Sequence, residues 1–290
     1  MPDKNPYHSY VPSVPAAIIA ALVFIVLSIG HTYLLIRSRK WFASAIIIGG
    51  LFEVIGFAAR AYNHSHLDES GPFIIQTLLI LLAPILFAAS VYMFLGRLIN
   101  AAGGQKYSII RTTWLTKIFV VGDVLCFLIQ AGGAGILVNA DTKEENDKAS
   151  NIILAGLALQ VLFFALFVLA AVLFHVRARS RALWQHAASS GLYLGRVLAS
   201  LYAVGVLITL RNIYRFAEFK EGQDGYLLEH EWPVYAFDAA LMAIVMAITL
   251  YWYGVPLNPK GGEEGYQLND EDSYNNQYQT PYQNTYPNAN

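Results

Sequence analysis

Residues 14–36 read VPAAIIAALVFIVLSIGHTYLLI and contain no charged side chain. A helix rises about 1.5 Å per residue, so about 20 apolar residues cross the hydrocarbon core of a bilayer. The run is longer than the roughly 7–15 apolar residues of a signal peptide, and no basic segment precedes it. We therefore expect this segment to be a retained transmembrane helix.

Six further apolar runs follow along the chain. They cover residues 41–62, 73–95, 113–137, 151–175, 192–215 and 232–253. Hydrophobic residues make up 56% of the sequence and charged residues only 13%, against about 25% charged residues in a soluble domain. Hydrocarbon offers the backbone no hydrogen-bond partner, so spans of this length are helical. The predicted fold is all-α, a polytopic membrane bundle of seven transmembrane helices.

Lysine and arginine are concentrated in alternate connections between these runs. The connections after the first, third and fifth runs carry Arg37, Arg39, Lys40, Arg97, Lys106, Arg111, Arg177, Arg179 and Arg181. The other connections are poorer in basic residues. Because cytosolic loops keep the excess of positive charge, we expect the N-terminus outside and the C-terminus in the cytosol.

This orientation divides the chain into three parts. Residues 1–13 are predicted to be an extracellular tail, 14–254 the transmembrane domain, and 255–290 a cytosolic tail rich in Asn, Gln and Tyr. The last part has almost no aliphatic residues to bury, so we expect it to be disordered. Asn63 begins the glycosylation sequon Asn63-His64-Ser65 in a connection assigned to the outside, which makes it a glycosylation candidate.

Polar side chains interrupt the apolar runs. Ionisable groups cost several kcal/mol each inside a membrane, which makes them functional candidates. The candidate residues are Glu53, Arg60, Gln76, Asp123, Gln130, Gln160, Arg211, Arg215, Glu218 and Asp238. One hypothesis places them around a polar substrate cavity that opens towards the outer leaflet. The alternative is that they hold the helices in register by hydrogen bonds and ion pairs.

Other site chemistries find little support in the sequence. His31 is the one histidine well inside a predicted span, and Cys126 is the single cysteine, so we expect no metal site, no disulfide and no cofactor. No serine–histidine–acid arrangement is visible, and we predict no catalytic residues. The net charge of −1 gives no field that would attract nucleic acid.

Two motifs carry a family resemblance. Glu53-Val54-Ile55-Gly56-Phe57-Ala58-Ala59-Arg60 resembles the E-x-x-G-[YF]-x-x-R signature of the fungal lipid-translocating exporter family, also called the aminocholesterol-resistance family. The stretch Arg211-Asn212-Ile213-Tyr214-Arg215-Phe216-Ala217-Glu218, which continues to His230-Glu231 and Phe237-Asp238, resembles a second signature of the same family. The resemblance extends from about residue 16 to residue 253.

The resemblance implies a seven-span fungal protein that exports or translocates amphipathic lipids such as sphingoid long-chain bases, or toxic sterol-like compounds. The partners implied are membrane lipids or amphipathic small molecules. The plasma membrane is the favoured location, with a vacuolar or other endomembrane as the alternative. A seven-span receptor or lipid sensor without transport is the second hypothesis, and an intramembrane hydrolase is the third. The sequence leaves the transported compound, its direction and the oligomeric state open.

Overall fold

The computed structural model describes residues 11–66, 70–138, 142–178, 181–189, 191–221 and 225–257. Throughout these ranges the regular structure is helical. The long helices are α1 (Val14–Ser38), α2 (Ser44–Asn63), α3 (Ser70–Ala101), α4 (Thr112–Val138), α5 (Lys143–Arg177), α7 (Leu194–Glu221) and α9 (Ala240–Thr249). The short ones are η1 (Trp41–Ala43), η2 (Gln105–Tyr107), α6 (Arg181–Ser189), α8 (Tyr226–Glu229), η3 (Val234–Ala239) and η4 (Leu250–Gly254).

Seven helical segments are long and apolar enough to cross a membrane, the last being the continuous run of η3, α9 and η4. The predicted all-α bundle of seven spans is therefore confirmed. The outward orientation of the N-terminus stays a prediction. Most of the predicted tails, residues 1–10 and 258–290, lies outside the described residues.

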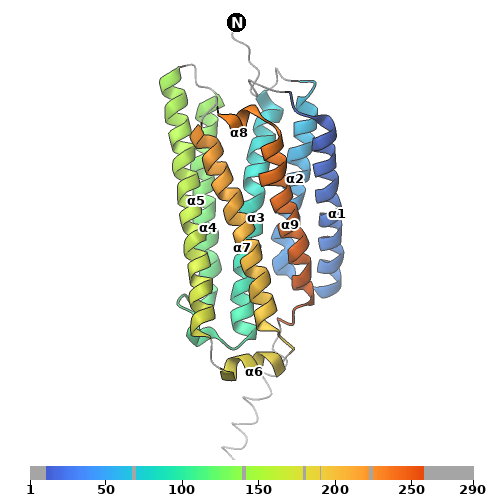
Figure 1. Cartoon of the computed structure of the whole chain (residues 1–290), viewed down its shortest axis with the longest axis vertical. Coiled ribbons are helices and arrows are strands. Elements are labelled where there is room, and N and C mark those ends of the chain that lie inside the picture. The colour runs from blue at the N-terminus through green and yellow to red at the C-terminus, as the bar shows by residue number, and fades with distance from the viewer. Residues whose placement is uncertain are drawn as a thin grey trace, which may run out of the picture. The chain divides into compact units, whose positions relative to one another are not determined.

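The spans pack side by side in a closed ring, in the order α1, α2, α3, α4, α5, α7 and α9, with α9 returning to α1 (Figure 1). Helix α3 also contacts α7 across the ring. It is the most buried span. Of an 18-residue apolar stretch of α3, 72% is buried inside the bundle, against 28% to 50% for the corresponding stretches of the other spans. Helix α6 lies at one end of the bundle and α8 at the other (Figure 1).

Several helices extend beyond the predicted apolar runs. Helix α5 begins at Lys143 rather than near residue 151, because Thr142 and Glu145 form a capping box at its start. The short helix α6 was not predicted, since only apolar runs of membrane-spanning length were counted. Helix α5 therefore continues into polar sequence where a cap satisfies its first amide groups.

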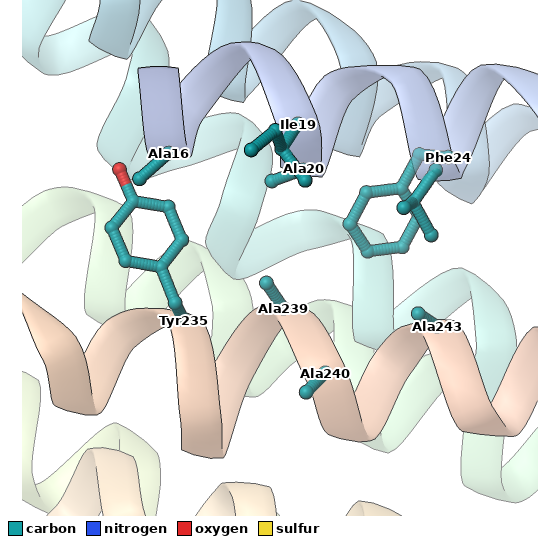
Figure 2. A pocket seen from close by; sticks show the side chains of 9 residues that line it. Ala16, Ile19, Ala20, Phe24, Tyr235, Ala239, Ala240 and Ala243 are labelled. Atoms are coloured by element: carbon teal, nitrogen blue, oxygen red, sulfur yellow. The ribbon is translucent and has the colours of Figure 1, made fainter. Parts of the chain in front are cut away.

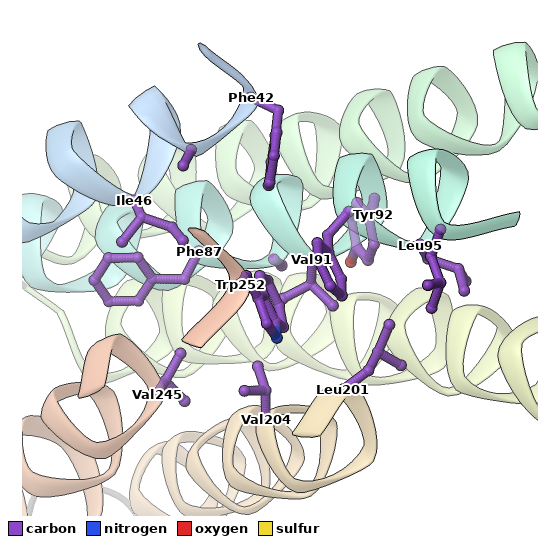
Figure 3. Close-up of a cluster of buried hydrophobic side chains, with 14 of the residues drawn as sticks. Phe42, Ile46, Phe87, Val91, Tyr92, Leu95, Leu201, Val204, Val245 and Trp252 are labelled. Carbon is purple, nitrogen blue, oxygen red and sulfur yellow. The ribbon is translucent and has the colours of Figure 1, made fainter. Parts of the chain in front are cut away.

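Aromatic side chains, Trp252 among them, belong to a cluster of buried hydrophobic residues where the last span ends (Figure 3). The Phe94 and Trp252 rings stack with centroids 3.9 Å apart, and Trp252 Nε1 donates to Ser200 Oγ at 3.0 Å. Lys40 Nζ donates to the backbone carbonyls of Trp252, Tyr253 and Val255. A cation at the C-terminal end of a helix is stabilising, so Lys40 helps to fix where the last span ends.

Candidate functional site

An ion-pair network joins α7 to η3 in the interior of the bundle. Arg211 Nε donates to Asp238 Oδ1 at 2.7 Å, and Arg215 pairs with the other oxygen of Asp238. Arg215 Nη1 also lies 2.9 Å from Glu218 Oε2, one helical turn away. We call these four residues the Arg211 network. Buried charges are stable only when paired and hydrogen-bonded, and here each arginine has a carboxylate.

A proline on the central helix supplies a further partner to this network. Pro84 lacks an N–H group, so the carbonyl of Ile80, four residues earlier in α3, receives no helical hydrogen bond from it. Arg211 Nη2 donates to that carbonyl oxygen at 3.0 Å. The carbonyl that Pro84 leaves without a helical hydrogen bond is thus bonded by the guanidinium of another helix. As a result, α3, α7 and η3 are joined at one point.

Asp238 lies in a π-helical segment, which follows Pro233. Such widened turns are uncommon and recur at functional sites. In the same segment Tyr235 faces a second polar group, described next. The π-helical segment therefore serves two polar sites.

The second group surrounds Arg60 at the N-terminal end of α1. Arg60 Nη2 lies 3.1 Å from Glu231 Oε1, and Tyr235 donates its hydroxyl to the same oxygen at 2.9 Å. The backbone amide of Ser13 donates to both carboxylate oxygens of Glu231 at 2.9 Å. Glu231 is 17% exposed and Arg60 2%. We call these residues the Arg60 site.

Sequence reasoning missed Glu231 as the partner of Arg60. It belongs to a polar connection, where a carboxylate is ordinary, and the only available signal was the family resemblance near His230-Glu231. Glu231 also accepts the amide of the residue that precedes α1, where the helix dipole favours a negative charge. One carboxylate therefore fixes α1 to α2 and to the last span.

Glu53 lies within the bundle with no exposed surface. Neither of its carboxylate oxygens has a hydrogen-bond partner within the described residues. One turn to either side, Gly49 and Gly56 allow α2 to approach α3 closely, since a Cβ added there would lie 2.6 Å from Phe87 and from Ile80 respectively. The charges that act on Glu53 are those of Arg211 and Arg215.

The remaining predicted residues lie in separate pairs. Tyr92 donates its hydroxyl to Asp123 Oδ2 at 2.8 Å, between α3 and α4. Gln130 donates to Gln160 at 2.8 Å, between α4 and α5. Helix α4 packs against α3 and α5 in the ring, away from α7 and α9. Asp123, Gln130 and Gln160 thus have partners outside the Arg211 network, and the hypothesis of one polar cavity for all ten residues stays a prediction.

The glycosylation prediction at Asn63 does not agree with the fold. Asn63 is 1% exposed at the end of α2, and its Nδ2 donates to Gln76 Oε1 at 3.3 Å. Nδ2 is the atom that would carry a glycan. Because it faces the interior, the sequon is closed to modification in the folded chain.

An apolar groove runs between α1 and α9 (Figure 2). Its volume is about 300 Å³. The lining residues are Ala16, Ile19, Ala20, Val23, Phe24, Tyr235, Ala239, Ala240 and Ala243. Ile19 is 62% exposed on the outer surface of the bundle, so the groove opens towards lipid.

One aromatic side chain of α2 packs against residues that line the groove. The ring of Phe57 stacks on Phe24 and on Tyr235, each with centroids 5.9 Å apart, and both partners line the groove. On α2, Phe57 stands between Glu53 and Arg60, one turn from each. Its ring therefore packs behind two groove-lining side chains, on the same helix as Glu53 and Arg60.

The histidine in the first span has partners of its own. His31 Nε2 lies 2.9 Å from the Met246 carbonyl oxygen, and Nδ1 lies 3.1 Å from the Tyr253 hydroxyl. Within the described residues, no group of three or more His, Cys, Asp or Glu side chains is arranged to hold a metal ion. His31 thus acts as a hydrogen-bonded link between α1 and the last span.

Comparison with known proteins places this sequence in a family. The model of the family described as RTA1 like protein matches residues 46–258. The chain belongs to the RTA1-like family. The matched region contains Glu53, Arg60 and the Arg211 network. The resemblance to fungal lipid-translocating exporters is therefore confirmed.

Relatives of this RTA1-like protein occur in Saccharomyces cerevisiae. Protein RTM1 is 34% identical over 233 residues, which cover 79% of this chain and 74% of that protein. Protoporphyrin uptake protein 1 is 37% identical over 198 residues, 68% of this chain and 64%, just under two thirds, of that protein. The sphingoid long-chain base transporter RSB1 is 28% identical over 281 residues, 86% of this chain and 73% of that protein. No solved structure matches the chain.

Proposed function

We propose that this RTA1-like protein translocates amphipathic lipids with a single long alkyl chain, such as sphingoid long-chain bases, across a fungal membrane. The name of the relative RSB1 supports this substrate class. In keeping with the relatives named for transport or uptake, we propose a transporter rather than an enzyme.

The observation that carries the proposal is the combination of the lipid-facing groove with the Arg60 site at its end. Along α1 the groove extends from Ala16 to Phe24, about 12 Å at the helical rise. Small side chains of α9 leave room there for part of an alkyl chain. Tyr235 both lines the groove and bonds Glu231, so a bound amphiphile has its apolar part and a polar partner within one site.

The Arg60 site suits a headgroup that carries both amine and hydroxyl groups. Its guanidinium and tyrosine hydroxyl are donors, and its carboxylate is an acceptor. The carboxylate is the more exposed member of the ion pair, 17% against 2% for Arg60. An ammonium group therefore meets the negative partner first. With the N-terminus outside, this end of the groove faces the outer leaflet, in keeping with a place in the plasma membrane.

The proposal is tested by filling the groove. The Ala240→Phe substitution adds a ring to an exposed groove-lining position on α9. The purified full-length protein is reconstituted in liposomes with fluorescent single-chain amines and fluorescent phospholipids, and transbilayer movement is measured by quenching from outside. We expect wild-type protein to accelerate movement of the amines, and Ala240→Phe to slow it at least tenfold.

Ala165→Phe provides the matched control, because Ala165 is also exposed on a span but lies on α5, away from the groove. We expect it to transport at the wild-type rate. Equal rates for all three proteins would contradict the assignment of the groove. Saturable amine binding without any accelerated movement would instead support the second hypothesis, a lipid receptor or sensor.

A further inference from the structure

Beside the Arg211 network lies one more acidic group than that network requires. Arg211 and Arg215 carry two positive charges, and Asp238 and Glu218 carry two negative charges in direct ion pairs with them. The four groups are neutral together. Glu53 is a third carboxyl group in the same field, so its ionisation would leave one unbalanced negative charge in the interior.

Within the described residues no side chain is hydrogen-bonded to Glu53, although Arg211 Nη1 and Arg215 Nε are buried donors that also lack a partner there. On α1, His31 is directed to Met246 and Tyr253 of the last span. On α3, the described residues from 71 to 96 include no charged side chain, and Tyr92 bonds Asp123. The charged and titratable groups of α2, α7 and η3 nearest to this region are Arg60, Arg211, Tyr214, Arg215, Glu218, Tyr235 and Asp238, all of which are in hydrogen bonds or ion pairs.

A fully buried carboxylate without hydrogen bonds is costly, and a low-dielectric interior favours either the neutral carboxyl group or a bound cation. The charge balance leaves room for one positive charge at Glu53. Phe57, one turn from Glu53 on α2, packs against Phe24 and Tyr235, which line the groove that we propose for the amphiphile. The groove is therefore the side from which we expect the cationic headgroup of the amphiphile to approach Glu53.

We propose that Glu53 holds one cation at a time, either a proton or the ammonium group of the transported amphiphile, and that the protein therefore exchanges protons for long-chain amines. This inference rests on the proposed function. In the exchange step, the neutral Glu53 carboxyl group and an alkylammonium ion give a Glu53 carboxylate–alkylammonium ion pair and one free proton. No bond to carbon changes, and charge is conserved because one positive charge enters as another leaves.

Proton release on binding tests the exchange directly. Full-length protein in lipid nanodiscs is titrated with dodecylamine, which stays protonated near neutral pH as a lysine amine does. Calorimetry in two buffers of different ionisation enthalpy gives the number of protons released per amine bound. We expect about one proton for the wild-type protein, and a dissociation constant that falls about tenfold per pH unit while Glu53 is protonated.

Three variants complete the experiment. Glu53→Gln should bind dodecylamine about 10- to 100-fold more weakly, having lost a charge-assisted hydrogen bond, and should release no proton. Glu53→Asp keeps a carboxyl group and should still release one. Asp123→Asn, which alters a buried carboxyl group hydrogen-bonded to Tyr92 elsewhere in the ring, should also release one.

The outcomes separate this inference from the function on which it rests. Wild-type binding without proton release overturns the exchange and leaves lipid translocation standing. Unchanged proton release in Glu53→Gln overturns the assignment to Glu53. Absence of any saturable binding to the wild-type protein overturns the proposed substrate class, and the exchange with it.

Discussion

Replacing Asp238 with asparagine removes the carboxylate shared by the fully buried Arg211 and by Arg215, whose side chain is 12% exposed. Asp238 has no exposed surface and pairs with both Arg211 and Arg215. Breaking a buried ion pair from one side costs about 3–5 kcal/mol, or about two to four orders of magnitude in the unfolding equilibrium constant. We expect the lower end of this range, about 3 kcal/mol, because Glu53 can ionise and restore a neutral interior.

The role of Glu53 makes this prediction sharper in a double-variant cycle. In a Glu53→Gln background no spare carboxyl group remains, so Asp238→Asn should cost about 5 kcal/mol. The free energy of unfolding is measured in mixed micelles from tryptophan fluorescence for the four proteins of the cycle. If Asp238→Asn cost the same free energy in both backgrounds, within about 0.5 kcal/mol, the reasoning that Glu53 and the Arg211 network share one charge balance would be refuted.

Glu144→Gln is the control, because it removes an ion pair that is exposed rather than buried. Glu144 pairs with Lys148 at 2.7 Å, but the two side chains are 79% and 68% exposed. Exposed pairs of this spacing contribute only about 0.3–0.5 kcal/mol. The control should therefore leave the unfolding free energy nearly unchanged.

Three further predictions test the packing and the ends of the spans. Gly49→Ala should destabilise the bundle by about 1–3 kcal/mol, because the new Cβ would lie 2.6 Å from Phe87. Gly132→Ala has open space around the new Cβ and should be neutral or stabilising by up to about 1 kcal/mol. Thermal unfolding of both variants measures the difference. Glu231→Gln weakens the ion pair and the acceptor at the start of α1, so amide hydrogen exchange in the first turn of α1 should be faster, by about tenfold, than in the wild type. Burial lowers the pKa of Lys40 in the folded chain from its ordinary value of 10.5. Between the folded and the unfolded pKa the unfolded chain binds the proton more tightly, so the free energy of unfolding rises with pH. A Lys40→Gln variant should lack that rise in alkaline unfolding titrations.

The seven spans could be predicted from the sequence because their signal is local. An apolar run of membrane-spanning length is visible in one window, and each predicted run overlaps one observed span. The residues at which the helices begin and end were less predictable. The capping box of Thr142 continues α5 into charged sequence, and α6 carries no long apolar run. Both depend on a few side chains rather than on average hydropathy.

The polar residues could be identified from the sequence, but their partners could not. Arg215 and Glu218 lie three residues apart on one helix, so their contact was foreseeable from helical spacing. The partner of Arg60 is a carboxylate in a polar connection, and one partner of Arg211 is the backbone carbonyl of Ile80. Neither is marked by an unusual residue in a span. Pairing between helices depends on ring order, which the apolar runs do not encode.

The same contacts explain why the bundle can bind a cation without losing its architecture. Arg211 is held by Asp238 and by the Ile80 carbonyl that Pro84 leaves unbonded, so its position does not depend on Glu53. Glu53 is thus free to change its charge while the ion pairs that join α3, α7 and η3 remain intact. A carboxyl group that also held two helices together would have to break those contacts whenever it released a proton. Separation of the structural acids from the exchangeable one is what allows a single buried site to be filled and emptied repeatedly.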